Sequence, residues 1–252
     1  MNGKPIAMNT LRATSQGDFD RRAADFVQRS LMVRPGATVA LPTGRTPLGL
    51  YAELRARHGR GEFAPGDARF FQLDEYVGLG AGDPRSFAFT LGAGLLSRVS
   101  AAPANVHLIR GDAPDLLAEC DRYETLLAEC GGLDLAILGL GANGHIGFNE
   151  PGTSWKSRTH VVPLAQETRA AMMSTPGTFE TSTLPHRGIT MGIGTILDAR
   201  EILLLVRGIA KRPALEALLH AKPDAHWPAT ALLSHPRCTA ILSEEFHVAE
   251  NA

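Results

Sequence analysis

At 252 residues, 44% of them hydrophobic, the chain can bury a sizeable α/β core, and its net charge of −1 gives no indication of nucleic acid or a membrane surface as partner. Three widely spaced cysteines, Cys120, Cys130 and Cys238, predict neither a disulfide framework nor a zinc site. Since neither a signal peptide nor an apolar run of about 18 residues is found, we expect a soluble protein of the reducing cytoplasm.

Strand-like and helix-like stretches alternate along the chain. After a leader, 1–8, that we expect to be loose, an amphipathic helix is predicted from Phe19 to Ser30 with Asp18 as its N-cap. Further helices are predicted over 48–57, 116–130 and 210–220, and strands over 38–41, 70–73, 106–109, 135–140, 189–192, 201–206 and 239–242. This alternation is typical of a Rossmann-like α/β fold with helices on both faces of a mostly parallel sheet, and we expect one domain over 9–250.

The first candidate site follows strand 38–41, because ligands of open α/β sheets bind at the carboxyl ends of the strands. Thr46 suits the N-cap of the next helix and Pro47 its first turn, while Gly44 lets a ligand approach the backbone closely. Free N–H groups at a helix N-terminus favour phosphate, with Arg45 and the hydroxyls of Thr43 and Thr46 adding contacts. The alternative is an ordinary strand-to-helix turn.

Two acids, Asp74 and Glu75, follow strand 70–73. Successive side chains of an extended chain point to opposite sides, so one acid can enter a pocket while the other faces the protein. An acid at this edge of the sheet can act as a general base. The alternative is a structural carboxylate that pairs with Arg69 or Arg85.

The strand 135–140 runs into a glycine-rich loop that carries Asn143, His145 and Glu150. Histidine titrates near neutrality and can move a proton on a bound substrate, and Glu150 can orient or polarise it. The spacing of these residues matches no metal site.

Lys211, after strand 201–206, can bind an anion as a point charge or be a solvated surface lysine. The stretch 174–187 is either a mobile flap or a surface loop.

Together these residues resemble the glucosamine-6-phosphate deaminase (isomerase) family. The most specific pair of blocks is Asp-Glu-Tyr at 74–76 with Gly-His-Ile-Gly-Phe-Asn-Glu-Pro at 144–151. Matching blocks lie at 41–47, 73–79, 83–87, 144–151, 157–159 and 192–199. The related 6-phosphogluconolactonases share the Thr-Gly-x-Thr-Pro loop but usually carry Asp-Glu-Arg, so they rank second.

The resemblance implies that glucosamine 6-phosphate and water become fructose 6-phosphate and ammonia, without a metal or organic cofactor, in the breakdown of N-acetylglucosamine. It implies that His145 opens the sugar ring with the support of Asn143 and Glu150, and that Asp74 shuttles a proton from C2 to C1. It further implies a phosphate site made of Thr43, Gly44, Arg45, Thr46 and Lys211.

Three departures from the family pattern stand out. One branch has Asp where this chain has Asn143, which cannot titrate. A phosphate-binding Arg expected in the segment 168–174 is missing, so Arg45, Arg169 or another group must replace it, or the substrate differs. The stretch 160–163 lacks the basic residues of the branch that N-acetylglucosamine 6-phosphate activates, so we predict no such activation; the oligomeric state stays open, a homo-oligomer included.

Two further hypotheses compete with the deaminase. In the first, the same chemistry acts on a different amino sugar, a hypothesis suggested by the missing phosphate-binding Arg. A sugar-phosphate sensor without catalysis is the other, since effector domains of some transcription regulators share this fold. No helix-turn-helix segment precedes the expected domain, and the acid and histidine favour an enzyme.

Overall fold

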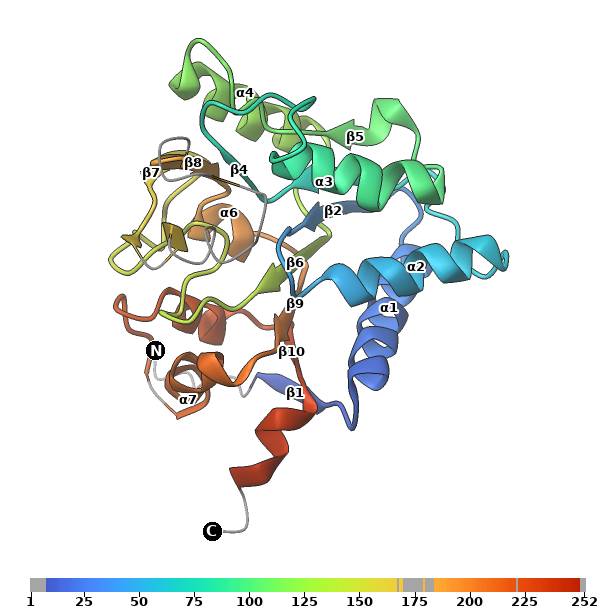
Figure 1. Ribbon diagram of the computed structural model, residues 1–252, viewed down its shortest axis with the longest axis vertical. Coiled ribbons are helices and arrows are strands. Elements are labelled where there is room, and N and C mark those ends of the chain that lie inside the picture. Colours follow the sequence, from blue (N-terminus) through green and yellow to red (C-terminus); the bar gives the residue numbers. More distant parts are fainter. Residues whose placement is uncertain (1–7, 167, 170–178, 180–183, 221, 250–252) are drawn as a thin grey trace.

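The computed structural model describes residues 8–166, 168–169, 179, 184–220 and 222–249 (Figure 1). Residues 1–7 of the expected leader and all of the expected flap 174–187 except 179 and 184–187 lie outside the described residues. No helix among the described residues is long and apolar enough to span a membrane.

The centre of the fold is a seven-stranded parallel sheet with the strand order β1-β10-β9-β6-β2-β3-β5. Its strands are β1 (Asn9–Arg12), β2 (Thr38–Leu41), β3 (Arg69–Gln72), β5 (Val106–His107), β6 (Leu135–Gly139), β9 (Glu201–Val206) and β10 (Cys238–Leu242). Six of these were predicted to within two residues at each end, and β1 was not predicted. The order confirms the predicted Rossmann-like architecture.

Helices cover both faces of this sheet, as predicted. In Figure 1, α1 (Gln16–Val33) and α2 (Leu48–Gly59) lie to the right of the sheet, and α6 (Ile193–Leu197) and α7 (Arg212–His220) lie to its left. The remaining helices that the argument uses are α3 (Phe87–Gly94), α4 (Leu116–Glu129) and the short 3-10 turns η4 (Ile209–Lys211) and η5 (Pro228–Ser234).

The apolar strands are buried on both faces because their side chains alternate between two cores. In β6, Leu135 and Ile137 belong to the core under α1, α2 and α3, whereas Ala136 and Leu138 belong to the core under α4, α6 and α7. All four side chains are 0% exposed. The continuous apolar run that predicted this strand is therefore the signature of its central position.

A second, three-stranded antiparallel sheet has the order β4-β8-β7, from β4 (Asp74–Tyr76), β8 (Arg187–Thr190) and β7 (His160–Pro163). The sequence predicts the run 189–192 as a strand of the mostly parallel sheet. It contributes instead to β8, because its partners are β4 and β7 rather than a neighbour in the parallel sheet. This small sheet has its own core around Tyr76 and Phe148.

Two predicted helix caps are wrong. The N-cap of α1 is Ser15, whose hydroxyl accepts the N–H of Asp18 at 3.2 Å, and the Asp18 carboxylate in turn accepts the N–H of Thr14 at 2.9 Å. Helix α2 begins at Leu48, as predicted, but Pro47 takes the cap position and no side chain caps the helix. Thr46 therefore does not cap α2.

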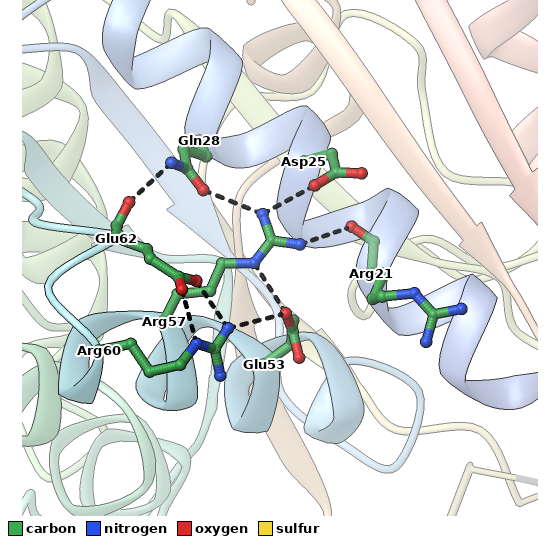
Figure 2. Close-up of polar contacts among 7 residues, drawn as sticks. All are labelled: Arg21, Asp25, Gln28, Glu53, Arg57, Arg60 and Glu62. Atoms are coloured by element: carbon green, nitrogen blue, oxygen red, sulfur yellow. Dashed lines mark hydrogen bonds and ion pairs between the residues drawn. The ribbon is translucent and has the colours of Figure 1, made fainter.

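A buried arginine joins α1 to α2 (Figure 2). Arg57, 9% exposed, donates to Glu53 of its own helix at 2.8 Å and reaches Asp25 of α1 at 2.8 Å and Gln28 at 2.9 Å. A buried charge needs such partners, because an unpaired one costs several kcal/mol. The network therefore ties the second half of α2 to α1.

Candidate active site

The predicted site residues follow neighbouring strands of the parallel sheet. Lys211 follows β9, the loop of Asn143, His145 and Glu150 follows β6, the turn 43–46 follows β2, and Asp74 follows β3. These four strands are adjacent in the order β9-β6-β2-β3. Because they run parallel, all of these residues emerge at one edge, where the crossovers change direction between β6 and β2.

Asp74 is a buried carboxyl group at this edge. It is 7% exposed, and its Oδ1 has no hydrogen-bond partner among the described residues. Burial, and next the charge of Glu75, raise the pKa of Asp74 to about 8, while a hydrogen bond from the Thr43 side chain acts against them. Arg85, one of the alternative partners, pairs with Asp83 at 2.6 Å instead.

The histidine loop is shaped by two glycines. Gly144 has φ +83°, a left-handed conformation that favours glycine, and its N–H donates to the carbonyl of Gly141 at 3.1 Å. The N–H of Gly141 donates to the carbonyl of His145 at 2.8 Å. A Cβ atom on Gly141 would lie 2.3 Å from the His145 ring, so this glycine makes room for the imidazole.

Glu150 connects the polar groups of this loop. Its Oε2 accepts the Asn143 amide at 2.8 Å and lies 3.5 Å from Nδ1 of His145, a distance typical of an ion pair rather than a direct hydrogen bond. Its Oε1 accepts the hydroxyl of Thr168 at 2.6 Å. Burial raises the pKa of Glu150, but His145, Thr168 and Asn143 outweigh it, so the pKa lies below the usual value. Glu150 is thus held as a carboxylate beside the imidazole.

The loop is also tied to the small antiparallel sheet. The Asn149 amide donates to the carbonyls of Ile146 and Met191, both at 2.8 Å, and the Thr190 hydroxyl accepts the N–H of Phe148 at 3.1 Å. Thr190 of β8 is also the register partner of Asp74. The strand that carries the acid and the loop that carries the histidine therefore share one rigid neighbour.

Two cations accompany the turn 43–46. Gly44 has φ +92°, and Arg45 is exposed. Burial, and next the nearby charge of Arg45, lower the pKa of Lys211, which places the two cations within electrostatic reach of each other. An anion between them would relieve this repulsion. Among the described residues, no group of three or more His, Cys, Asp or Glu side chains could hold a metal ion.

Sequence reasoning assigned no role to Thr168 and left that of Glu75 open. Thr168 lies 18 positions from Glu150, and no local pattern signals a contact over that distance. Arg169 follows it with a buried Nε that has no hydrogen-bond partner among the described residues.

Taken as a whole, the edge offers a buried acid, an imidazole–carboxylate pair and two cations, the groups needed for proton transfer on a bound anion.

A protein-family model described as glucosamine-6-phosphate isomerases/6-phosphogluconolactonase matches residues 14–241, which is most of the chain. The chain belongs to this family. The glucosamine-6-phosphate deaminase of Shouchella clausii (strain KSM-K16) is 40% identical over 238 residues, covering 94% of this chain and 96% of the relative. That of Pseudarthrobacter chlorophenolicus is 42% identical over 225 residues, covering 88% and 85%.

Two solved structures show how far the similarity extends. A monomeric glucosamine-6-phosphate deaminase superposes with a TM-score of 0.90 at 37% identity, covering 94% of this chain and 98% of that one. The 6-phosphogluconolactonase of Thermotoga maritima has a TM-score of 0.73 at 21% identity, covering 93% and 100%. The lactonase shows the shared fold alone, whereas the deaminase is a relative in sequence as well.

Proposed function

We propose that this protein converts glucosamine 6-phosphate and water to fructose 6-phosphate and ammonia. The observation that carries the proposal is the single sheet edge at which Asp74, the His145–Glu150 pair and the cations Arg45 and Lys211 emerge together. The similarity to glucosamine-6-phosphate deaminases over nearly the whole chain supports it. The three cysteines are free, which fits a reducing compartment, and we place the enzyme in the cytoplasm, acting as one domain over 9–250.

The sugar binds through its phosphate, and the ring opens first. Backbone N–H groups of the turn 43–46, with Arg45 and Lys211, hold the phosphate dianion. His145 takes the proton of the anomeric hydroxyl and returns a proton to the ring oxygen, which breaks the C1–O5 bond and leaves an aldehyde at C1. Glu150 stabilises the imidazolium that forms in between, and the Asn143 amide fixes that carboxylate.

Asp74 then moves the carbon-bound proton. Its carboxylate takes the proton from C2, and the electron pair forms the C1–C2 double bond of an enolamine while the C1 carbonyl π bond breaks and its oxygen takes up a proton from water. Returning the proton to C1 gives a ketimine at C2, and water adds to this imine and expels ammonia. A pKa raised toward the operating pH makes the Asp74 carboxylate a stronger base than an ordinary aspartate.

The missing family arginine bears on the substrate. Arg45 stands in the phosphate turn itself, within electrostatic reach of Lys211, so the two supply the charge that the absent side chain would bring. We therefore favour a phosphorylated amino sugar. A different amino sugar would use the same Asp74 and His145 chemistry, and it is the second candidate.

A substrate comparison tests the proposal. We would measure kcat/KM for glucosamine 6-phosphate, unphosphorylated glucosamine and 6-phosphogluconolactone, for the wild type and for Arg45→Ala. We expect glucosamine 6-phosphate to be preferred by at least about a hundredfold, and Arg45→Ala to reduce that preference by about tenfold or more. Lactone hydrolysis without ammonia release from the amino sugar would overturn the proposal.

A further inference from the structure

Glu75 is a buried carboxylate that the proposed mechanism does not use. It is 0% exposed and sits on β4 directly after Asp74, so its side chain points to the opposite side of the strand. Four donors surround it. Its Oε1 accepts the N–H groups of Tyr76 at 2.8 Å and Phe87 at 3.0 Å, and its Oε2 accepts the N–H of Ala88 and the Gln72 amide, both at 2.8 Å.

This environment is built for a carboxylate and not for an amide. Phe87 and Ala88 open α3, where unpaired N–H groups and the helix dipole favour negative charge. All four contacts are donors, so a glutamine at position 75 would turn its own NH2 group toward other N–H groups. Burial raises the pKa of Glu75 above its usual value, and these hydrogen bonds reduce that rise without cancelling it.

Gln72 connects this carboxylate to the backbone of Asp74. Its Nε2 donates to the Asp74 carbonyl at 2.7 Å as well as to Glu75, and its Oε1 accepts the N–H of Ile109 at 3.1 Å. The chain changes sheets here: the N–H of Leu73 donates to the carbonyl of Leu41 in β2, whereas Asp74 pairs with β8. The direction of the Asp74 side chain is set at this crossing.

We propose that Glu75 is a positioning residue for Asp74: by binding the N-terminus of α3 and the Gln72 amide, it fixes the peptide that directs the Asp74 carboxyl group into the site. The inference rests on the proposed role of Asp74 as the base. The charge of Glu75 also contributes to the raised pKa of Asp74, after burial. Burial, and after it the charge of Asp74 among other groups, raises the pKa of the phenols of Tyr51, Tyr76 and Tyr123.

Two variants separate the effect of the charge of Glu75 from the effect of its side-chain length. Glu75→Gln keeps the length and removes the charge, whereas Glu75→Asp keeps the charge and is one methylene too short to reach both α3 and Gln72. We expect kcat to fall by about tenfold or more in both variants, with KM changed less than about threefold, because the phosphate turn is not touched. The acidic limb of the kcat/KM profile should move to lower pH in Glu75→Gln only.

A direct titration keeps the test independent of turnover. The Asp74 carboxyl 13C resonance, assigned by its loss in Asp74→Asn, should titrate about one pH unit or more lower in Glu75→Gln and near the wild-type midpoint in Glu75→Asp. If the wild type does not turn over glucosamine 6-phosphate, the proposed function fails, and this titration still tests the coupling of Glu75 to Asp74.

The matched control is Glu119→Gln. Glu119 is 4% exposed and also accepts a backbone N–H, that of Arg110, at 2.9 Å, but it belongs to α4 and has no contact with Asp74 among the described residues. We expect its kcat and the Asp74 midpoint to match the wild type. The proposal is overturned if folded Glu75→Gln and Glu75→Asp keep wild-type kcat, or if the Asp74 midpoint is the same in all proteins. If Glu75→Gln does not fold, Gln72→Met replaces it in the test. This variant keeps Glu75 but removes the hydrogen bond to the Asp74 carbonyl, so its kcat must fall while the titration midpoint of Asp74 stays the same.

Discussion

Replacing Asp74 by Asn should make the protein more stable, and increasingly so as the pH rises. Between the ordinary pKa of 3.8 and the value of about 8 in the fold, the unfolded chain has released the Asp74 proton and the folded chain keeps it. The free energy of unfolding therefore falls by about 1.4 kcal/mol for each pH unit in this window. The amide that Asp74→Asn introduces does not titrate in this range, so the free energy of unfolding of the variant does not fall in this way.

The magnitude follows from that window. From pH 5 to pH 8 the stability of Asp74→Asn relative to the wild type should grow by about 4 kcal/mol, and level off above pH 8. Urea unfolding at half-unit pH steps measures it. Asp83→Asn is the control, because Arg85 lowers the pKa of that half-buried acid to about 2 and its removal should give no such gain. Wild-type and Asp74→Asn curves that stay parallel across the range would refute the reasoning.

Three further predictions concern the histidine loop and regulation. Thr168→Val, which loses the hydroxyl bonded to Glu150, should lower kcat/KM about tenfold, while Thr168→Ser should restore it; equal rates for Val and Ser would exclude that contact. Gly141→Ala should displace the His145 ring and lower kcat about a hundredfold, whereas Gly82→Ala, with open space around it, should not; an active Gly141→Ala would show that the ring position does not matter. N-acetylglucosamine 6-phosphate should leave the rate curve hyperbolic, because the stretch 160–163 lacks the basic residues of the activated branch and the nearby Arg158 is already paired with Glu124 and Asp198. A sigmoidal curve that this sugar makes hyperbolic would contradict the prediction.

Much of the architecture was accessible from local patterns. The strand β6 could be predicted because Leu135 to Leu138 are apolar without interruption, which a strand buried on both faces requires. The site loops could be located because polar residues and glycines directly follow such strands, and parallel strands bring their carboxyl ends together. The antiparallel pairing of β8 could not be predicted, because the residues of a strand do not indicate which other strands it pairs with.

The contacts that complete the site depend on long-range geometry. The bond between Thr168 and Glu150, and the bridge from Gln72 to both Asp74 and Glu75, form only once separate elements are packed. Alternation along the strand predicted that one of the two acids would face the protein. Two of the donors that hold it come from α3, twelve and thirteen positions further along the chain, and sequence alone did not reveal them.

The fate of the hydrogen on C2 tests the central claim most directly. Glucosamine 6-phosphate carrying deuterium at C2 would be supplied to the wild type, and ammonia, fructose 6-phosphate and the position of the label would be measured together. The account predicts that each ammonia released is matched by one fructose 6-phosphate and by the loss of deuterium from C2, to C1 or to water. Ammonia released while deuterium is still bound to C2 would contradict proton transfer by Asp74 and the proposed reaction with it.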